Sequence, residues 1–225
     1  RDLHSFPTRR SSDLPMAMIR QNVEEVLDAF GYGGGARVVI SIPNGEELAA
    51  KTFNPDRIYI VTLSRYRDIL HEQLPGVDED RIILEPYGRN TAPAILHAAY
   101  VLLKRDPEAV MAIFPADHAI NKELIFFRTV DKALDYADTH DVLLTLGIVP
   151  ERPDTNFGYV QVSGGTYGGD PVKAKTFTEK PGKELAQVFI ESGEFLWNSG
   201  IFFWKASLIV SEMEKLCPEI TMLWK

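Results

Sequence analysis

Four short groups of polar residues, each bordering an apolar run, are the parts of this sequence that could do chemistry. They read LEPYGRNTAPAI (84–95), FPADHAI (114–120), TFTEKP (176–181) and LWNSGIFFW (196–204). In an open α/β sheet, ligands bind beyond the carboxyl ends of the strands. Polar residues that border strand-like runs are therefore the first candidates for a site.

The first group forms a polar turn directly before a helical pattern. Asn90 or Thr91 can cap that helix, and the free amides of its first turn would then face a bound anion or carbonyl. Taken alone, the same residues also describe an ordinary turn with a capped helix. The sequence leaves both readings open at this point.

The second group places Asp117 immediately after a strand pattern. A carboxylate there can hold Mg²⁺ by one oxygen while substrate phosphates supply other ligands. A helix cap is the alternative for a single aspartate. We expect His118 to be an orienting or surface histidine and not a zinc ligand, because no second histidine or cysteine lies at ligand spacing.

The third and fourth groups offer contacts suited to a sugar phosphate. Glu179 can accept hydrogen bonds from sugar hydroxyls, and the ammonium of Lys180 can meet a phosphate. Asn198 offers both a donor and an acceptor ahead of an apolar strand, and Gly200 permits close backbone approach. An exposed ion-pair turn and a buried strand are the alternatives for these two groups.

Strand and helix patterns alternate along the chain and must position these groups. Strand-like runs at 57–62, 110–118 and 142–148 are separated by helical patterns, and an amphipathic helix is predicted over 18–30. This order predicts an α/β fold with a mostly parallel or mixed sheet flanked by helices. Beyond Pro150, shorter strands and glycine-rich turns predict a mixed-sheet extension.

Composition narrows the classes of partner. The chain has 225 residues, 45% of them hydrophobic, and a net charge of -8, which disfavours nucleic acid. Its one cysteine, Cys217, excludes an internal disulfide and fits a reducing compartment. No run approaches the roughly 20 apolar residues that span a bilayer. We therefore expect a cytoplasmic protein that binds no membrane.

Taken in order, LEPYGRNTAPAI, FPADHAI, NFGYVQV, FTEKP and LWNSGIFFW resemble the bacterial mannose-1-phosphate guanylyltransferases. The resemblance covers roughly residues 54–223. It implies a Rossmann-like nucleotidyltransferase fold. It also implies transfer of GMP from GTP to α-D-mannose 1-phosphate, which gives GDP-mannose and pyrophosphate, with Mg²⁺ as cofactor.

The resemblance also implies a role for each candidate residue. The residues expected to lie against the nucleotide are Glu85, Arg89, Asn90 and Thr91. Those expected to surround the sugar are Gly158, Tyr159, Glu179 and Asn198. The catalytic pair would be Asp117, which binds Mg²⁺, and Lys180, which meets the phosphate of the sugar.

The sequence departs from the family at its N-terminal side. Residues 4–14, HSFPTRRSSDL, match the translation of a widely used short-read sequencing adapter, so we treat residues 1–14 as an artefact. We expect residues 15–225 to be one nucleotidyltransferase domain, truncated at both ends. The family opens with a strand and a G-G-x-G-T-R loop that holds the triphosphate. GGGAR (33–37) has neither the threonine nor a preceding strand, so the chain as written is expected to be inactive.

Other functions stay open. The motifs specify a sugar phosphate better than they specify mannose, so the substrate could be another sugar 1-phosphate. A non-catalytic relative that senses sugar nucleotides could lack the loop by nature. The sequence also leaves open a homo-oligomer and a C-terminal isomerase domain, and it does not explain the poor fit of residues 33–53 to the family.

Sequencing the source DNA across the Leu14–Pro15 junction tests the adapter and the missing loop together. We expect the true upstream sequence to encode a strand followed by G-G-x-G-T-R. Unrelated sequence ahead of Pro15 would instead make the non-catalytic relative the leading interpretation.

Overall fold

The computed structural model describes residues 37–42, 57–88, 90–115, 118, 123–162 and 171–222. The helix expected over 18–30, the glycine-rich stretch after it, Arg89 and Asp117 lie outside these residues. The chain divides into two compact units, Arg1–Leu143 with Phe203–Lys225, and Leu144–Phe202. Each unit is described by itself.

The first unit is built on a mixed sheet. Its strands are β1 (Arg37–Ile42), β2 (Ile58–Leu63), β3 (Ile82–Glu85) and β4 (Val110–Pro115), in the order β3-β2-β1-β4. The order continues to β8 (Phe195–Lys205), whose residues 203–205 belong to this unit. β2 and β3 are parallel, whereas β1 is antiparallel to both β2 and β4. The sheet is therefore mixed and not mostly parallel, because β1 interrupts the parallel run.

The carboxyl ends of β2, β3 and β4 lie at one edge of this sheet. β1 runs antiparallel to β2 on one side and to β4 on the other, so β2, β3 and β4 share one direction. The turn after β3 opens from this edge. The polar group that follows β3 therefore lies beyond the carboxyl end of a strand, where open α/β sheets bind ligands.

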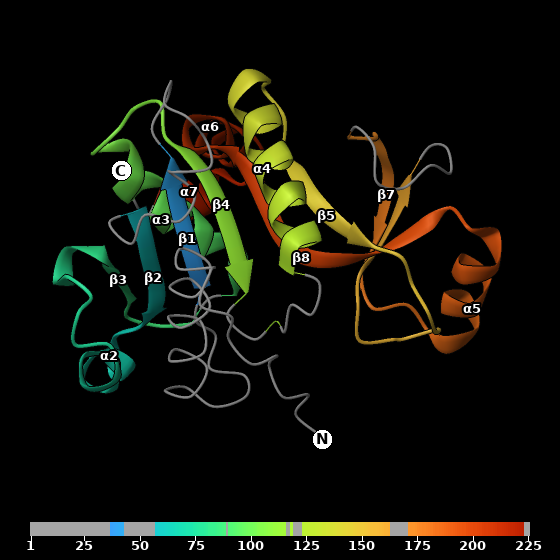
Figure 1. The fold of residues 1–225 in the computed structure, drawn as a ribbon, viewed down its shortest axis with the longest axis horizontal. Coiled ribbons are helices and arrows are strands. Elements are labelled where there is room, and N and C mark those ends of the chain that lie inside the picture. The colour runs from blue at the N-terminus through green and yellow to red at the C-terminus, as the bar shows by residue number, and fades with distance from the viewer. Residues whose placement is uncertain are drawn as a thin grey trace. The chain divides into compact units, whose positions relative to one another are not determined.

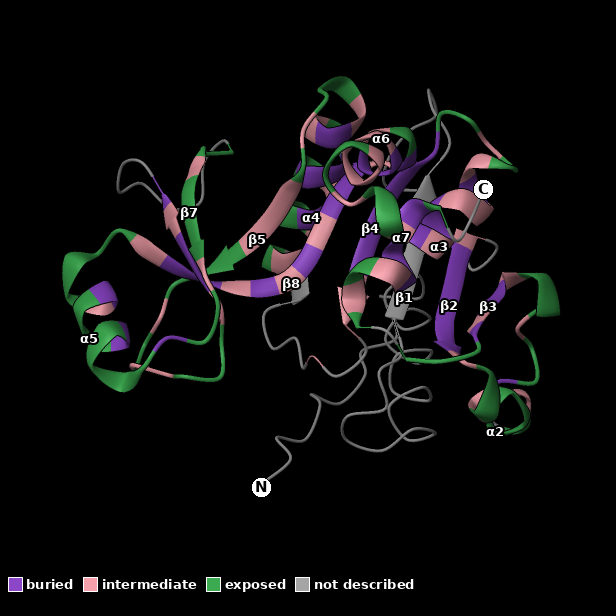
Figure 2. Cartoon of the chain, turned by 180° about the vertical axis from the view of Figure 1, so that it is seen from behind, coloured by how far each residue is buried: buried purple, intermediate pink, exposed green. Residues whose placement is uncertain are grey.

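Helices cover both faces of the first sheet (Figures 1 and 2). α4 (Glu123–Thr139) lies on one face, and α3 (Thr91–Leu103) and α6 (Ala206–Leu216) pack against each other on the other face. Ile58–Thr62 of β2 are consecutive buried residues. A strand covered on both faces takes such a continuous apolar run in place of alternation.

Shorter helices complete the first unit. The 3-10 turn η3 (Ser64–Tyr66) and α2 (Arg67–Gln73) connect β2 to the 3-10 turn η4 (Glu79–Arg81) and β3. Leu70 of α2 packs in a buried cluster with Ile60 and Ile82 of the sheet. α7 (Pro218–Thr221) begins with proline at its first position, where the missing N–H would have no helical partner.

The second unit is the mixed-sheet extension that the sequence predicts. Its sheet contains β5 (Leu144–Ile148), β6 (Tyr159–Val162), β7 (Ala174–Thr178) and residues 195–202 of β8. β6 is antiparallel to both β7 and β8, and β5 pairs with β8. One sequence boundary was wrong: Asn198–Gly200 lie inside β8 and not ahead of it.

One helix covers one face of the second sheet. α5 (Lys183–Ser192) contributes Ala186 and Phe189 to a buried cluster with Tyr159 and Trp197. The ring centroids of Tyr159 and Phe189 lie 5.4 Å apart. α5 ends at Gly193, whose φ of 67° is the left-handed conformation that glycine adopts without a steric penalty.

No helix within the described ranges is both long enough and apolar enough to cross a bilayer.

Truncating a core leucine of α3 tests the packing of the first unit. Leu96 is 0% exposed, so Leu96→Ala leaves a cavity and should lower the free energy of unfolding by about 2–5 kcal/mol. Leu216→Ala, at a leucine that is 75% exposed on α6, is the matched control and should change it by less than about 0.5 kcal/mol. Urea denaturation of both variants checks this, and equal losses would contradict the assigned packing.

Candidate functional site

Three of the sequence motifs meet in one row across the second sheet. Strand register pairs Tyr159 of β6 with Thr178 of β7 and with Trp197 of β8. One step along the antiparallel strands, the next row is Glu179, Gly158 and Asn198. The backbone N–H of Asn198 donates to the carbonyl of Gly158 at 2.8 Å, which agrees with this alignment. Residues opposite one another point to the same face, so Glu179 and Asn198 flank Gly158 there.

Gly158 lies in close contact with both of these side chains. A Cβ at position 158 would lie 2.9 Å from Glu179 Oε2 and 3.6 Å from Asn198 Cβ. The first distance is shorter than ordinary van der Waals contact. A side chain at 158 would therefore push the Glu179 carboxylate aside, so glycine permits the close approach seen here.

Lys180 takes an unusual backbone conformation directly after this row. Its φ is 44°, although it precedes Pro181 and is not glycine. Such a conformation is costly for a residue with a side chain, and it is enriched at functional sites. Glu179 and Lys180 have side chains that are 73% and 63% exposed, with Nζ and Oε1 3.7 Å apart. Both charges are accessible to a ligand.

Asn198 is held in place by its neighbours. Its Oδ1 accepts a hydrogen bond from the Gly200 N–H at 3.2 Å and from the Thr145 hydroxyl at 2.9 Å. Gly200 has a φ of 72°, which allows the backbone to turn back toward the side chain two residues earlier. Sequence reasoning missed Thr145, because one threonine within the apolar run VLLTLGI gives no signal.

Tyr159 does not bring its side chain to this row. Alternation along β6 places it on the opposite face from Gly158, where it is 0% exposed beneath α5. Its hydroxyl donates to the carbonyl of Asp154 at 3.0 Å. This geometry corrects the expected sugar contact of Tyr159, which is limited to its backbone.

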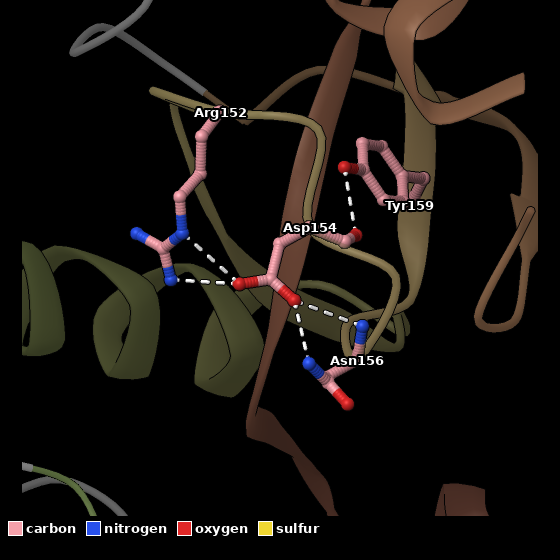
Figure 3. Close-up of polar contacts among 4 residues, drawn as sticks. All are labelled: Arg152, Asp154, Asn156 and Tyr159. Carbon is pink, nitrogen blue, oxygen red and sulfur yellow. Dashed lines mark hydrogen bonds and ion pairs between the residues drawn. The ribbon is translucent and has the colours of Figure 1, made fainter. Parts of the chain in front are cut away.

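The turn that leads into Gly158 is fixed by one carboxylate (Figure 3). Asp154 Oδ2 accepts hydrogen bonds from Arg152 Nε and Nη2, at 3.1 and 2.7 Å. Its Oδ1 accepts from the backbone N–H and the Nδ2 of Asn156, both at 2.9 Å. The Arg152 guanidinium lies 5.3 Å from the ring centroid of Trp197. Sequence reasoning missed this turn, although an aspartate two residues before an asparagine is typical of such turns.

The residues expected at the nucleotide lie at the carboxyl end of β3 in the first unit. Glu85 is the last residue of β3 and is buried, and its carbonyl accepts a hydrogen bond from Ser64 Oγ at 3.0 Å. Asn90 stands at the N-cap of α3, and Thr91 is the first residue of that helix. The expected capping by Asn90 is wrong in its detail, because the Asn90 side chain makes no capping hydrogen bond.

Asn90 shares the backbone feature found at Lys180. Its φ is 69°, and in the described part of the chain these two are the only residues other than glycine with positive φ. Each lies in a group that the sequence singles out. Backbone strain of this kind persists where the surroundings hold it, and it concentrates at ligand sites.

Two predicted residues cannot be placed. Arg89 and Asp117 lie outside the described residues, so their roles remain predictions. His118 is described and is partly buried. Across the residues that the structure describes, no three His, Cys, Asp or Glu side chains gather closely enough to hold a metal ion.

Comparison with known families shows the class of protein to which the chain belongs. The family model described as "Nucleotidyl transferase" matches residues 46–225, and the chain belongs to this family. A second model, CbiD, matches residues 11–61, of which the structure describes only 37–42 and 57–61.

The chain is also similar to individual curated proteins. The chain is 38% identical over 165 residues to a mannose-1-phosphate guanylyltransferase of Klebsiella pneumoniae, and 39% identical over 168 residues to one of Escherichia coli. Each match covers 72% of this chain and 35% of the relative. The chain therefore spans about a third of the length of these curated relatives.

Solved structures share the fold. A protein described as a mannose-1-phosphate geranyltransferase from Thermus thermophilus matches with a TM-score of 0.69 and 22% identity, over 89% of this chain and 52% of that one. A protein described as a mannose-6-phosphate isomerase from Helicobacter pylori matches with a TM-score of 0.60 and 30% identity, over 71% and 59%. The Rossmann-like nucleotidyltransferase fold expected from the sequence is confirmed.

The Asp154 turn should make stability depend on acid pH. Hydrogen bonding, first from the Asn156 backbone and then from the side chains of Asn156 and Arg152, lowers the pKa of Asp154 below its ordinary value of 3.8. The unfolded state then binds the proton more readily, so this stabilisation is complete above pH 3.8 and is lost as pH falls through the folded pKa. Asp154→Asn should flatten the acid loss of unfolding free energy measured in urea between about pH 2 and 5.

The matched control is Glu151→Gln, which removes an exposed carboxylate from the same turn. It should keep the wild-type profile. An unchanged acid profile in Asp154→Asn would contradict the assigned hydrogen bonds.

Proposed function

We propose that the full-length protein containing this chain transfers GMP from GTP to α-D-mannose 1-phosphate, giving GDP-mannose and pyrophosphate. The observation that carries the proposal is the row Glu179, Gly158 and Asn198, brought together from three motifs by the register of β6 with β7 and β8. Membership of the nucleotidyl transferase family and the identity to named guanylyltransferases support it.

The row has the chemistry of a sugar-phosphate site. An ionised Glu179 can only accept hydrogen bonds, which suits a sugar hydroxyl, and Asn198 supplies amide donors beside it. The exposed ammonium of Lys180 follows directly and can pair with a phosphate. The sugar would bind against the face of the sheet that carries Glu179 and Asn198.

The nucleotide would bind at the carboxyl edge of the first sheet. Glu85, Asn90 and Thr91 lie where β3 passes into α3, and Arg89 precedes Asn90 in the sequence. Backbone amides at the start of a helix favour phosphate or carbonyl oxygens. The positive φ of Asn90 supports a ligand-binding role for this turn.

Mg²⁺ is part of the proposal, with Asp117 as its ligand. The described residues hold no carboxylate cluster, and Mg²⁺ bound mainly by substrate phosphates needs only one or two carboxylates. The ion would neutralise charge on the triphosphate. Asp117 itself lies outside the residues that the structure describes.

The chemistry requires no covalent enzyme intermediate. A phosphate oxygen of the sugar phosphate attacks the α-phosphorus of GTP in line, a new P–O bond forms, and the bond to pyrophosphate breaks with its electron pair leaving on oxygen. Glu179 and Asn198 would orient the sugar, and Lys180 would hold the attacking phosphate and reduce its repulsion from the nucleotide.

We also propose a cytoplasmic enzyme without nucleic-acid partners. The net charge of -8 agrees with the absence of a nucleic-acid partner.

The test is an assay of the full-length protein with GTP, mannose 1-phosphate and Mg²⁺. GDP-mannose and pyrophosphate should form in equal amounts. Formation of a different nucleotide sugar from another sugar 1-phosphate would support the alternative specificity, whereas binding of GDP-mannose without turnover would support the sensing relative.

The variant Lys180→Ala tests which of the two substrates the Lys180 ammonium contacts. Because the ammonium pairs with the phosphate of the sugar, the variant should weaken mannose 1-phosphate binding by about tenfold or more and leave GTP binding nearly unchanged. Lys175→Ala, at an exposed lysine of β7, is the control. Equal loss of both affinities in titration calorimetry would remove Lys180 from the sugar-phosphate site.

A further inference from the structure

The orientation of the Asn198 amide is determined by its neighbours. The backbone N–H of Gly200 lies 3.2 Å from one terminal atom of the amide, and a backbone N–H can only donate. That terminal atom must therefore be the oxygen, Oδ1. The amide nitrogen, Nδ2, then points away from Gly200 with both of its hydrogens.

Thr145 adds a second hydrogen bond to Oδ1 from the neighbouring strand, once the Gly200 N–H has set the orientation. Its hydroxyl lies 2.9 Å from Asn198 Oδ1 and 3.0 Å from the carbonyl of Ile201, so its one hydrogen is shared between two acceptors. A flipped amide would place Nδ2 against the Gly200 N–H, which is repulsive. The hydroxyl and the N–H thus occupy Oδ1 together, and in the described part of the chain Nδ2 has no hydrogen-bond partner.

We propose that Thr145 is a positioning residue that makes Asn198 a donor-only contact in the sugar site. This deepens the proposed function and rests on it. It also revises the expectation that Asn198 offers a sugar both a donor and an acceptor, because the acceptor is already used within the protein.

The consequence is a fixed polarity of the two side chains that flank Gly158. Glu179 accepts on one side, and Asn198 donates on the other. The pair matches a hydroxyl that donates to the carboxylate while its oxygen accepts from the amide, or two adjacent hydroxyls that divide these roles. A sugar that lacks the hydroxyl leaves this donor and acceptor without their ligand partner, which weakens its binding.

The structural part of the inference is tested without any ligand. Full-length protein labelled with [15N]asparagine should show two well-separated side-chain amide proton signals for Asn198. Thr145→Val removes the hydroxyl at nearly constant shape and should shift these signals, because Oδ1 loses one hydrogen bond, whereas Thr145→Ser should retain the wild-type pattern. Thr176→Val, at an exposed threonine of β7, is the matched control and should change nothing.

The ligand part compares mannose 1-phosphate with its 2-, 3- and 4-deoxy analogues by titration calorimetry. The wild-type protein should bind at least one analogue about tenfold more weakly than mannose 1-phosphate, and Thr145→Val should reduce that discrimination to roughly twofold by weakening only the parent sugar. Thr145→Ser should restore it, and GTP affinity should stay unchanged throughout.

The outcomes separate the two proposals. Thr145→Val with wild-type Asn198 signals and wild-type discrimination would overturn the positioning role while leaving the function intact. Failure of the wild-type protein to bind mannose 1-phosphate would instead overturn the proposed function, and the amide signals would still decide whether Thr145 fixes Asn198.

Discussion

The antiparallel register of β6 with its two neighbours is the constraint on which the candidate sugar site depends. Once Tyr159 is paired with Thr178 and with Trp197, the next residues of all three strands must share one row and one face. A slip of one residue would turn Glu179 and Asn198 toward the opposite face. The chemistry of the row is therefore a property of the sheet and not of any one motif.

Packing on the far face keeps that register. Tyr159 and Trp197 are large side chains buried with Ala186 and Phe189, and a slip of one residue would turn either ring away from this cluster. The Asp154 turn adds a second restraint, because the Tyr159 hydroxyl donates to the Asp154 carbonyl just ahead of Gly158. The hydrophobic cluster and the polar turn thus hold the same strand from its face and from its end.

The sequence predicts the elements whose signal is local. Continuous apolar runs identify β2 and β4, helical patterns between the runs identify α3 and α4, and motif order identifies the family. The antiparallel direction of β1 has no local signal, because an apolar strand reads the same in either direction. Thr145 could not be found either, since its role depends on a side chain 53 residues away in the sequence. The position of Tyr159 has a local signal, because alternation along β6 places its side chain on the opposite face from Gly158.

Asn90 in the first unit and Lys180 in the second share a positive backbone φ. Each residue has positive φ in a turn that follows a strand, and each such conformation costs on the order of 1–3 kcal/mol. Glycine would remove that cost at either position, but it would also remove an amide from one turn and an ammonium from the other. Pro181 adds to the restriction at Lys180, because a proline disfavours non-extended conformations in the residue before it. A side chain kept where glycine would be more stable is best explained by what that side chain binds, which is why the strained turns and the polar row point to the same function.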